Sequence, residues 1–194
     1  MSKVNRSGMW KITFNSPAVL GFGAICIFAL ILNIMTAGYA NSLIFSTYHS
    51  SLTDPMTYVR FITHVFGHSG WDHLIPNMSY ILLLGPLLEE KYGSRSIMYI
   101  ILVTALSTGI VNYVIFRESE LLGASGVCFA FILLSSFTSF YDREIPLTFI
   151  LVAVIFLGQQ IYEGLFLSDN IANFAHIIGG IIGAFFGFAY NRRY

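Results

Sequence analysis

Four polar side chains in otherwise apolar stretches have the chemistry of an activated serine: Ser125, His176, His73 and Asn77. A serine hydroxyl becomes a strong nucleophile when a neighbouring base such as histidine accepts its proton. A second imidazole and a carboxamide carry N–H donors that can stabilise negative charge on a carbonyl oxygen under attack. Polar groups inside membrane segments are costly and are therefore functional candidates. The set predicts acyl transfer, provided that the chain brings the four side chains together.

The composition predicts a protein embedded in lipid. Of the 194 residues, 56% are hydrophobic and 10% are charged, whereas soluble domains carry roughly 25% charged residues. Ten basic and ten acidic residues give a formal net charge of zero, so we expect no nucleic-acid partner. Cys26 and Cys128 lie in apolar stretches, and we interpret them as reduced, buried residues rather than a disulfide.

Uncharged stretches divide the chain into six expected membrane-spanning helices, at about residues 18–37, 73–88, 96–116, 121–141, 145–162 and 170–191. Their lengths suit a hydrocarbon core of about 30 Å, the shorter ones when neighbouring protein covers their ends. We therefore expect an all-α membrane protein, a six-transmembrane-helix bundle forming one domain over 1–194. Its expected parts are a tail at 1–17, a core at 18–190 with a long outer loop at about 38–72, and a tail at 191–194.

The basic residues predict the orientation of these helices. With both termini inside, the outer segments hold Arg60 and Arg117, and the inner segments hold eight basic residues: Lys3, Arg6, Lys11, Lys91, Arg95, Arg143, Arg192 and Arg193. This bias places both termini in the cytoplasm. The second, fourth and sixth helices then run inward. At about 1.5 Å per residue, Asn77, Ser125 and His176 all fall roughly 8–10 Å below the outer boundary.

Glycines near the candidate residues are spaced for close helix packing. Gly123 and Gly126 flank Ser125, and three glycines follow His176 at every fourth position: Gly179, Gly183 and Gly187. Such small-residue faces let membrane helices approach one another closely. If the two faces meet, the hydroxyl of Ser125 comes within reach of His176, which is the minimum for an activated serine.

In this order along the chain, the residues resemble the motifs of the rhomboid intramembrane serine proteases. Gly123-Ala124-Ser125-Gly126 resembles the family's GxSG motif, Ala175 to Gly183 its AHxxGxxxG helix, and His73 to Met78 its HxxxN motif. The resemblance covers about residues 57–189. It includes a GxxxExxxGS turn after the second helix and the first-loop residues Arg60, Thr63, His64 and His68.

The resemblance implies a role for each candidate residue. Ser125 would be the nucleophile and His176 the general base, without a carboxylate to orient the imidazole. Asn77, His73 and the backbone N–H of Ser125 would form the oxyanion hole. A rhomboid protease of this kind needs no cofactor and no metal.

The expected partners are the lipid bilayer and transmembrane protein substrates with helix-destabilising segments, because a scissile bond inside an intact helix is shielded. Cleavage is expected near the outer face of the bilayer, with residues 163–169 as a lid. A bacterial plasma (inner) membrane is the expected location. The sequence carries no signal that favours one oligomeric state over another.

Two positions differ from the family's usual residues. Val59 precedes Arg60 where rhomboids often carry tryptophan, which affects how the outer loop is anchored in the membrane. Phe129 stands four residues after Ser125, where many rhomboids have a tyrosine stacked on the catalytic histidine. This substitution keeps the aromatic ring and loses the hydroxyl.

Two other function classes fit part of the pattern. A catalytically silent rhomboid-like protein that binds transmembrane helices would keep the fold with Ser125 and His176 misaligned. A small transporter would need a polar path to both sides, but the first and third expected helices have little polarity. We interpret His64 and His68 as loop-structuring residues, because no carboxylate or thiolate stands at metal-site spacing.

Overall fold

The computed structural model describes residues 12–137, 147–166 and 170–191, with side chains left out at 149, 157, 159–161 and 163–172. This part of the chain is helical, with one isolated bridge between Thr47 and Leu121. The elements are α1 (Pro17–Met35), the π-helical turn η1 (Asn41–Phe45), α2 (Pro55–Thr63), the 3-10 turn η2 (His64–Phe66), α3 (Trp71–Tyr92), α4 (Ser94–Ile115), α5 (Ser125–Ser135), α6 (Leu147–Phe166) and α7 (Asn170–Asn191).

A helix occurs in each of the six predicted stretches. Within the described residues, three helical segments are long and apolar enough to cross a membrane: Pro17–Met35, Ser94–Ile115 and Asn173–Asn191. The crossing of all six helices stays a prediction. The placement of both termini in the cytoplasm also stays a prediction, because most of the basic residues that indicated it lie outside the described residues.

Helix α5 is shorter than predicted. The expected span was 121–141, but the helix begins at Ser125 and ends at Ser135, which corresponds to about 17 Å. Its start is delayed because Leu121 is bound to Thr47 of the outer loop, and residues 138–141 lie outside the described part. Eight of its eleven residues are buried, against α3, α4, α6 and α7. A helix shielded in this way can be shorter than the bilayer is thick.

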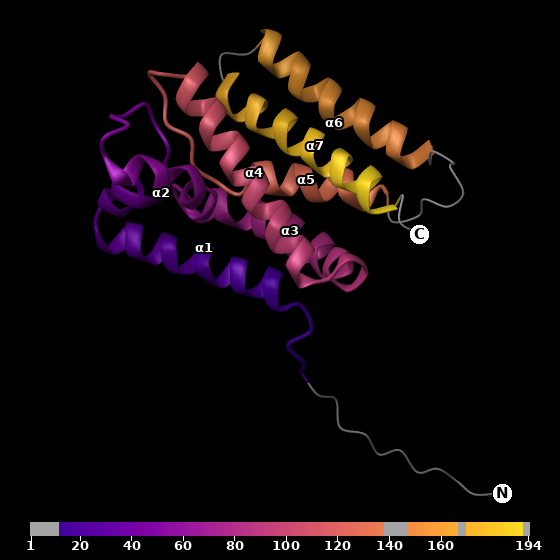
Figure 1. The fold of residues 1–194 in the computed structure, drawn as a ribbon. Helices are drawn as coiled ribbons and strands as arrows, with labels where there is room; N and C mark the ends of the chain where they lie inside the picture. Colours follow the sequence, from indigo (N-terminus) through magenta and orange to yellow (C-terminus); the bar gives the residue numbers. More distant parts are fainter. Residues whose placement is uncertain (1–11, 138–146, 167–169, 192–194) are drawn as a thin grey trace, which may run out of the picture.

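Figure 1 shows α1 along one edge of the bundle and α6 along the opposite edge, with α5 and α7 side by side. The outer loop predicted at about 38–72 contains η1, α2 and η2, which pack on one another and against α1 and α4. Residues 121 and 123, just before α5, therefore lie against this ordered outer loop. This packing determines where α5 begins.

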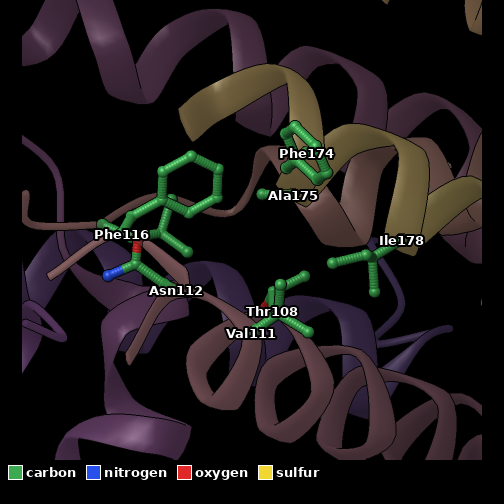
Figure 2. Close-up of a pocket in the computed structure, with 8 residues that line it drawn as sticks. Thr108, Val111, Asn112, Phe116, Phe174, Ala175 and Ile178 are labelled. Carbon is green, nitrogen blue, oxygen red and sulfur yellow. The ribbon is translucent and has the colours of Figure 1, made fainter. Parts of the chain in front are cut away.

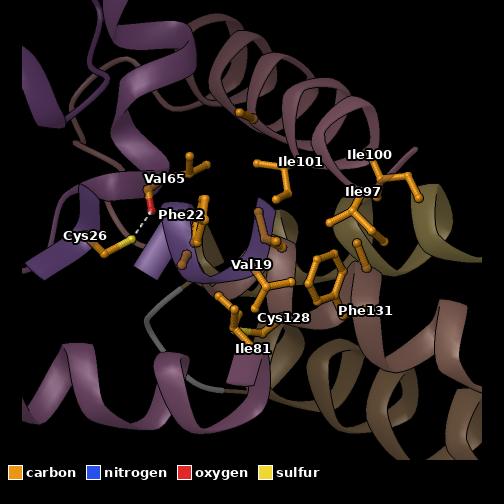
Figure 3. Close-up of a cluster of buried hydrophobic side chains, with 14 of the residues drawn as sticks. Val19, Phe22, Cys26, Val65, Ile81, Ile97, Ile100, Ile101, Cys128 and Phe131 are labelled. Carbon is orange, nitrogen blue, oxygen red and sulfur yellow. Dashed lines mark hydrogen bonds between the residues drawn. The ribbon is translucent and has the colours of Figure 1, made fainter. Parts of the chain in front are cut away.

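The core joins α1, α3, α4, α5 and α7 through interlocking apolar side chains, many of which appear in Figure 3. Both cysteines lie in it, buried and with free thiols, as predicted. In lipid such packing stabilises a bundle through close contact rather than through escape from water. Prominent members are Val19 and Phe22 of α1, Ile81 of α3, Ile97, Ile100 and Ile101 of α4, and Phe131 of α5.

Glu89 links three helices at the end of the bundle opposite the outer loop. It is 5% exposed, and its carboxylate accepts the backbone N–H groups of Ala18 and Val19 at 2.9 and 3.0 Å. It also accepts the hydroxyl of Ser94 at 2.6 Å. The N-cap residue Ser16 makes no side-chain cap, so Glu89 satisfies the free N–H groups of α1 in its place and meets the positive end of the helix dipole.

We expect Glu89→Gln to lower the free energy of unfolding by about 2 kcal/mol, because an amide NH₂ then faces buried N–H donors. The thermal midpoint of the purified protein in detergent measures this effect. The neighbouring Glu90 is exposed, so Glu90→Gln serves as the matched control and should change little. Equal midpoints for the two variants would contradict the capping role.

Candidate active site

The turn before α5 places Ser125 at the first position of the helix. Gly123 has φ of +124°, a conformation open to glycine and strained for other residues. A Cβ atom added to Gly123 would also lie 2.8 Å from His73 Nε2 and 3.9 Å from Asn77 Nδ2. Both predicted oxyanion-hole side chains on α3 therefore converge on the residue two positions before Ser125.

The outer loop holds this turn in place. The N–H of Gly123 donates to the carbonyl oxygen of His64 at 2.9 Å, and Thr47 and Leu121 exchange two backbone hydrogen bonds of 2.9 and 2.8 Å. The side chain of Asn112 on α4 donates to the carbonyl oxygen of Thr47 at 3.0 Å. The position of Ser125 thus depends on Thr47 and Asn112, neither of which the sequence had indicated.

Helices α5 and α7 touch backbone to backbone. A Cβ atom added to Gly179 would overlap the carbonyl oxygen of Gly126, and one added to Gly183 would overlap that of Ala130. The predicted glycine contact is therefore present. Because Gly126 also lies against the Ala175 carbonyl, the start of α5 faces the turn of α7 that carries His176.

The imidazole of His176 lies on the face of α5 that carries Ser125. Its ring stacks on Phe129 with centroids 4.3 Å apart and planes 10° from parallel. Phe129 is one helical turn after Ser125 and shares its face. Phe156 of α6 meets the same ring edge-on at 5.7 Å. The phenylalanine therefore fills the aromatic position predicted beside His176, and both Ser125 and His176 are partly buried.

The carboxamide of Asn77 is fully engaged by its neighbours. Its Nδ2 donates to the carbonyl oxygen of His73 at 3.1 Å and to Nε2 of His68 at 3.2 Å. The Sγ of Cys128 lies 3.5 Å from Asn77 Oδ1. In a regular helix the His73 carbonyl already accepts the N–H of residue 77, so of the two contacts of Nδ2 the one to this carbonyl is the more easily released.

The ring of His73 offers an N–H donor. Its Nδ1 accepts the backbone N–H of Ser69 at 3.5 Å and lies 3.3 Å from the Ser69 hydroxyl. A neutral ring with Nδ1 as acceptor carries its proton on Nε2, the atom beside Gly123. This geometry suits the oxyanion-hole role that the resemblance implied.

His68 and His64 are buried supports of the outer loop, as interpreted from the sequence. His68 Nδ1 donates to the carbonyl of Phe66 at 3.1 Å, so Nε2 is the acceptor for Asn77. His64 Nε2 donates to the carbonyl of Ala105 at 3.1 Å. Burial lowers the pKa of both imidazoles to about 4, so both are neutral at pH 7.

These two histidines predict acid sensitivity. Between pH 6.5 and 4 the unfolded chain binds protons that His64 and His68 do not bind in the folded protein, so stability falls as the pH is lowered. We expect each to lower the free energy of unfolding by about 2 kcal/mol at pH 5 relative to pH 7.5. Thermal midpoints at the two values test this. His68→Asn should reduce the dependence.

The loop arginine is held from three directions. Arg60 is 3% exposed and donates to the Leu43 carbonyl at 3.1 Å and to Asp54 at 2.9 Å. It also lies 4.6 Å above the ring of Tyr48. Val59, which stands where rhomboids often carry tryptophan, is exposed on α2. It belongs to an apolar face of this helix, shared with Tyr58 and Ile62.

A narrow gap of about 160 Å³ lies between the C-terminal part of α4 and the N-terminal part of α7 (Figure 2). No water-sized sphere fits inside it, and the rings of Phe116 and Phe174 close one side with centroids 5.2 Å apart. It is a packing gap rather than a binding pocket. The predicted lid at 163–169 lies outside the residues whose side chains are described.

Comparison with known proteins supports the family that the sequence resembles. The Rhomboid domain family model matches residues 55–193. The chain is similar to Rhomboid protease GlpG of Haemophilus influenzae, 25% identical over 170 residues that cover 85% of this chain and 86% of that protein. It is 31% identical to Rhomboid protease GluP of Bacillus subtilis over 151 residues, 75% of this chain and 28% of that protein.

Relatives from eukaryotes match over a shorter region. Rhomboid-related protein 1 of Caenorhabditis elegans is 32% identical over 138 residues, which cover 66% of this chain and 39% of that protein. Rhomboid-like protein 11, chloroplastic, of Arabidopsis thaliana is 27% identical over 131 residues, 66% of this chain and 42% of that protein. The chain thus spans well under half the length of these two relatives. The match to the Rhomboid domain at residues 55–193 covers most of this chain, so the chain belongs to the rhomboid family.

Proposed function

We propose that this protein is an intramembrane serine endopeptidase that cleaves transmembrane segments of membrane proteins near the outer face of the bilayer. The backbone contact between α5 and α7 carries the proposal, because it brings the start of α5, with Ser125, against the turn of α7 that holds His176. The stacking of His176 on Phe129 supports the same pairing. The proposed topology has six spans and both termini in the cytoplasm of a bacterial cell.

In the proposed reaction, the Ser125 hydroxyl attacks the scissile carbonyl while His176 accepts its proton. His176 then returns that proton to the leaving amine, and an acyl-enzyme remains. Water attacks the ester in a second step, again with His176 as base, and Ser125 is regenerated. In a serine–histidine–aspartate triad a carboxylate orients the imidazole. Here the stacking of His176 on Phe129 is proposed to hold the ring in place instead.

Three donors are proposed to stabilise the tetrahedral oxyanion: Nε2–H of His73, the backbone N–H of Ser125, and Nδ2–H of Asn77. The first is aimed at the turn before Ser125. The third has to leave the His73 carbonyl as the oxyanion forms. Donors aimed at developing charge in a dry site each contribute about 3 kcal/mol to transition-state stabilisation.

The proposed substrates are transmembrane helices that unwind easily. A peptide bond in an intact helix is hydrogen-bonded and sterically shielded, so residues such as glycine and proline near the cut should promote cleavage. Stiffening that segment with leucine and alanine should slow it.

Labelling with a fluorescent fluorophosphonate tests the proposal and separates it from a catalytically silent rhomboid-like protein. The purified protein in detergent should acquire one label, mapped by mass spectrometry to Ser125, and protein denatured beforehand should acquire none. A folded protein that stays unlabelled would instead favour the silent, helix-binding alternative.

A further inference from the structure

Cys128 is a buried thiol that reaches from α5 to α3. It is 3% exposed and lies three residues after Ser125. Its Sγ is 3.5 Å from Asn77 Oδ1 and 3.4 Å from the Asn77 carbonyl oxygen. Both distances suit an S–H···O hydrogen bond, but a thiol has one proton and is a weak donor. The Asn77 carbonyl oxygen lies inside α3, where a helix carbonyl accepts the N–H four residues later, so Oδ1 is the acceptor that depends on the thiol. Helix α5 therefore supplies a contact to the side chain proposed to bind the oxyanion.

Among the described residues, this thiol is the one hydrogen-bond donor to Asn77 Oδ1. The amide nitrogen has two acceptors, the His73 carbonyl and His68 Nε2. A buried carboxamide can rotate by half a turn and exchange its oxygen and nitrogen, and its hydrogen-bond partners decide which way it points. Without the thiol, Oδ1 would be a buried acceptor without a partner.

We propose that Cys128 is a positioning residue of the oxyanion hole. Its S–H group donates to Asn77 Oδ1 and, together with His68, keeps Asn77 Nδ2 directed toward His73 and the turn before Ser125. This inference rests on the proposed protease function. Because Cys128 does not touch the substrate, its removal should slow the chemical step and leave substrate binding unchanged.

The test compares Cys128→Ala with Cys128→Ser, since the two variants differ by one hydroxyl. The alanine variant leaves Oδ1 without a donor, and the serine hydroxyl restores one after a small shift. Cleavage of a fluorescent transmembrane reporter in liposomes gives kcat and KM. We expect kcat of the alanine variant to be about 3- to 10-fold below that of the serine variant, with equal KM.

Cys26→Ala is the matched control for the loss of a buried thiol. Cys26 lies in the same core (Figure 3), but its Sγ faces the carbonyl of Val65 at 4.0 Å rather than Asn77. Its kcat should equal that of wild type. A second control repeats the cysteine variants in an Asn77→Ala background, where the difference between alanine and serine should disappear because the two residues act as one unit.

The outcomes separate this inference from the proposed function. Equal kcat for the alanine and serine variants, or a difference that persists in the Asn77→Ala background, would overturn the positioning role while wild type still cleaves the reporter. A kcat loss that matches Cys26→Ala would overturn it too. A wild-type protein that neither cleaves the reporter nor reacts with the fluorophosphonate would overturn the protease function itself, and the inference with it.

Discussion

Replacing Ser125 by alanine is expected to abolish cleavage of a transmembrane reporter, with a loss in kcat of at least about 1,000-fold. Alanine cannot attack the carbonyl or form the acyl-enzyme, and only the oxyanion donors and substrate binding would still favour hydrolysis. Ser125 is partly buried at the first position of α5, where it makes no N-terminal cap, so the thermal midpoint should stay within about 2 °C of wild type. Rates in liposomes and midpoints in detergent measure the two effects.

Ser79→Ala is the matched control for the Ser125 variant. Ser79 is an exposed serine on α3 whose hydroxyl donates to the carbonyl of Ile75 in its own helix at 2.8 Å. Among the described residues, the hydrogen bond of its hydroxyl stays within α3. Its variant should cleave at the wild-type rate. A Ser125→Ala protein that still cleaves within tenfold of wild type would refute the assignment of the nucleophile.

Replacing Gly179 by alanine is expected to lower kcat at least about 100-fold and the free energy of unfolding by about 3 kcal/mol. The new methyl group would overlap the carbonyl of Gly126. This obstacle is backbone rather than a flexible side chain, so α5 and α7 must move apart. Such a shift separates Ser125 from His176, and a misplacement of about 1 Å can cost about 100-fold in rate.

Gly21→Ala is the control for adding a methyl group to a helical glycine. Gly21 lies on α1 with no atom within 4 Å of the added Cβ, so alanine should be neutral or slightly stabilising there. The activity and the midpoint of both variants are measured side by side. If Gly179→Ala kept both properties of wild type, the close contact of the two helices would not be what aligns the proposed catalytic pair.

The sequence alone identified the features that depend on residue type and spacing. Apolar stretches between charges located the helices, because a segment in lipid must satisfy its own backbone hydrogen bonds. Gly126 and Gly179 indicated a close helix contact, and the motif around Ser125 indicated the family. The family comparison confirmed that membership. The catalytic assignment of Ser125 and His176 stays a prediction until the labelling and cleavage experiments are done.

The tertiary structure decided the contacts between segments that are distant in the chain. No local pattern shows that Glu89 caps α1 or that Cys128 donates to Asn77. The late start of α5 likewise follows from the bridge between Thr47 and Leu121. Residues 121–124 are as apolar as the helix that follows them, so composition alone places them in the helix. Propensity and periodicity act over one or two helical turns, whereas these hydrogen bonds form only when the faces of different helices meet in one register.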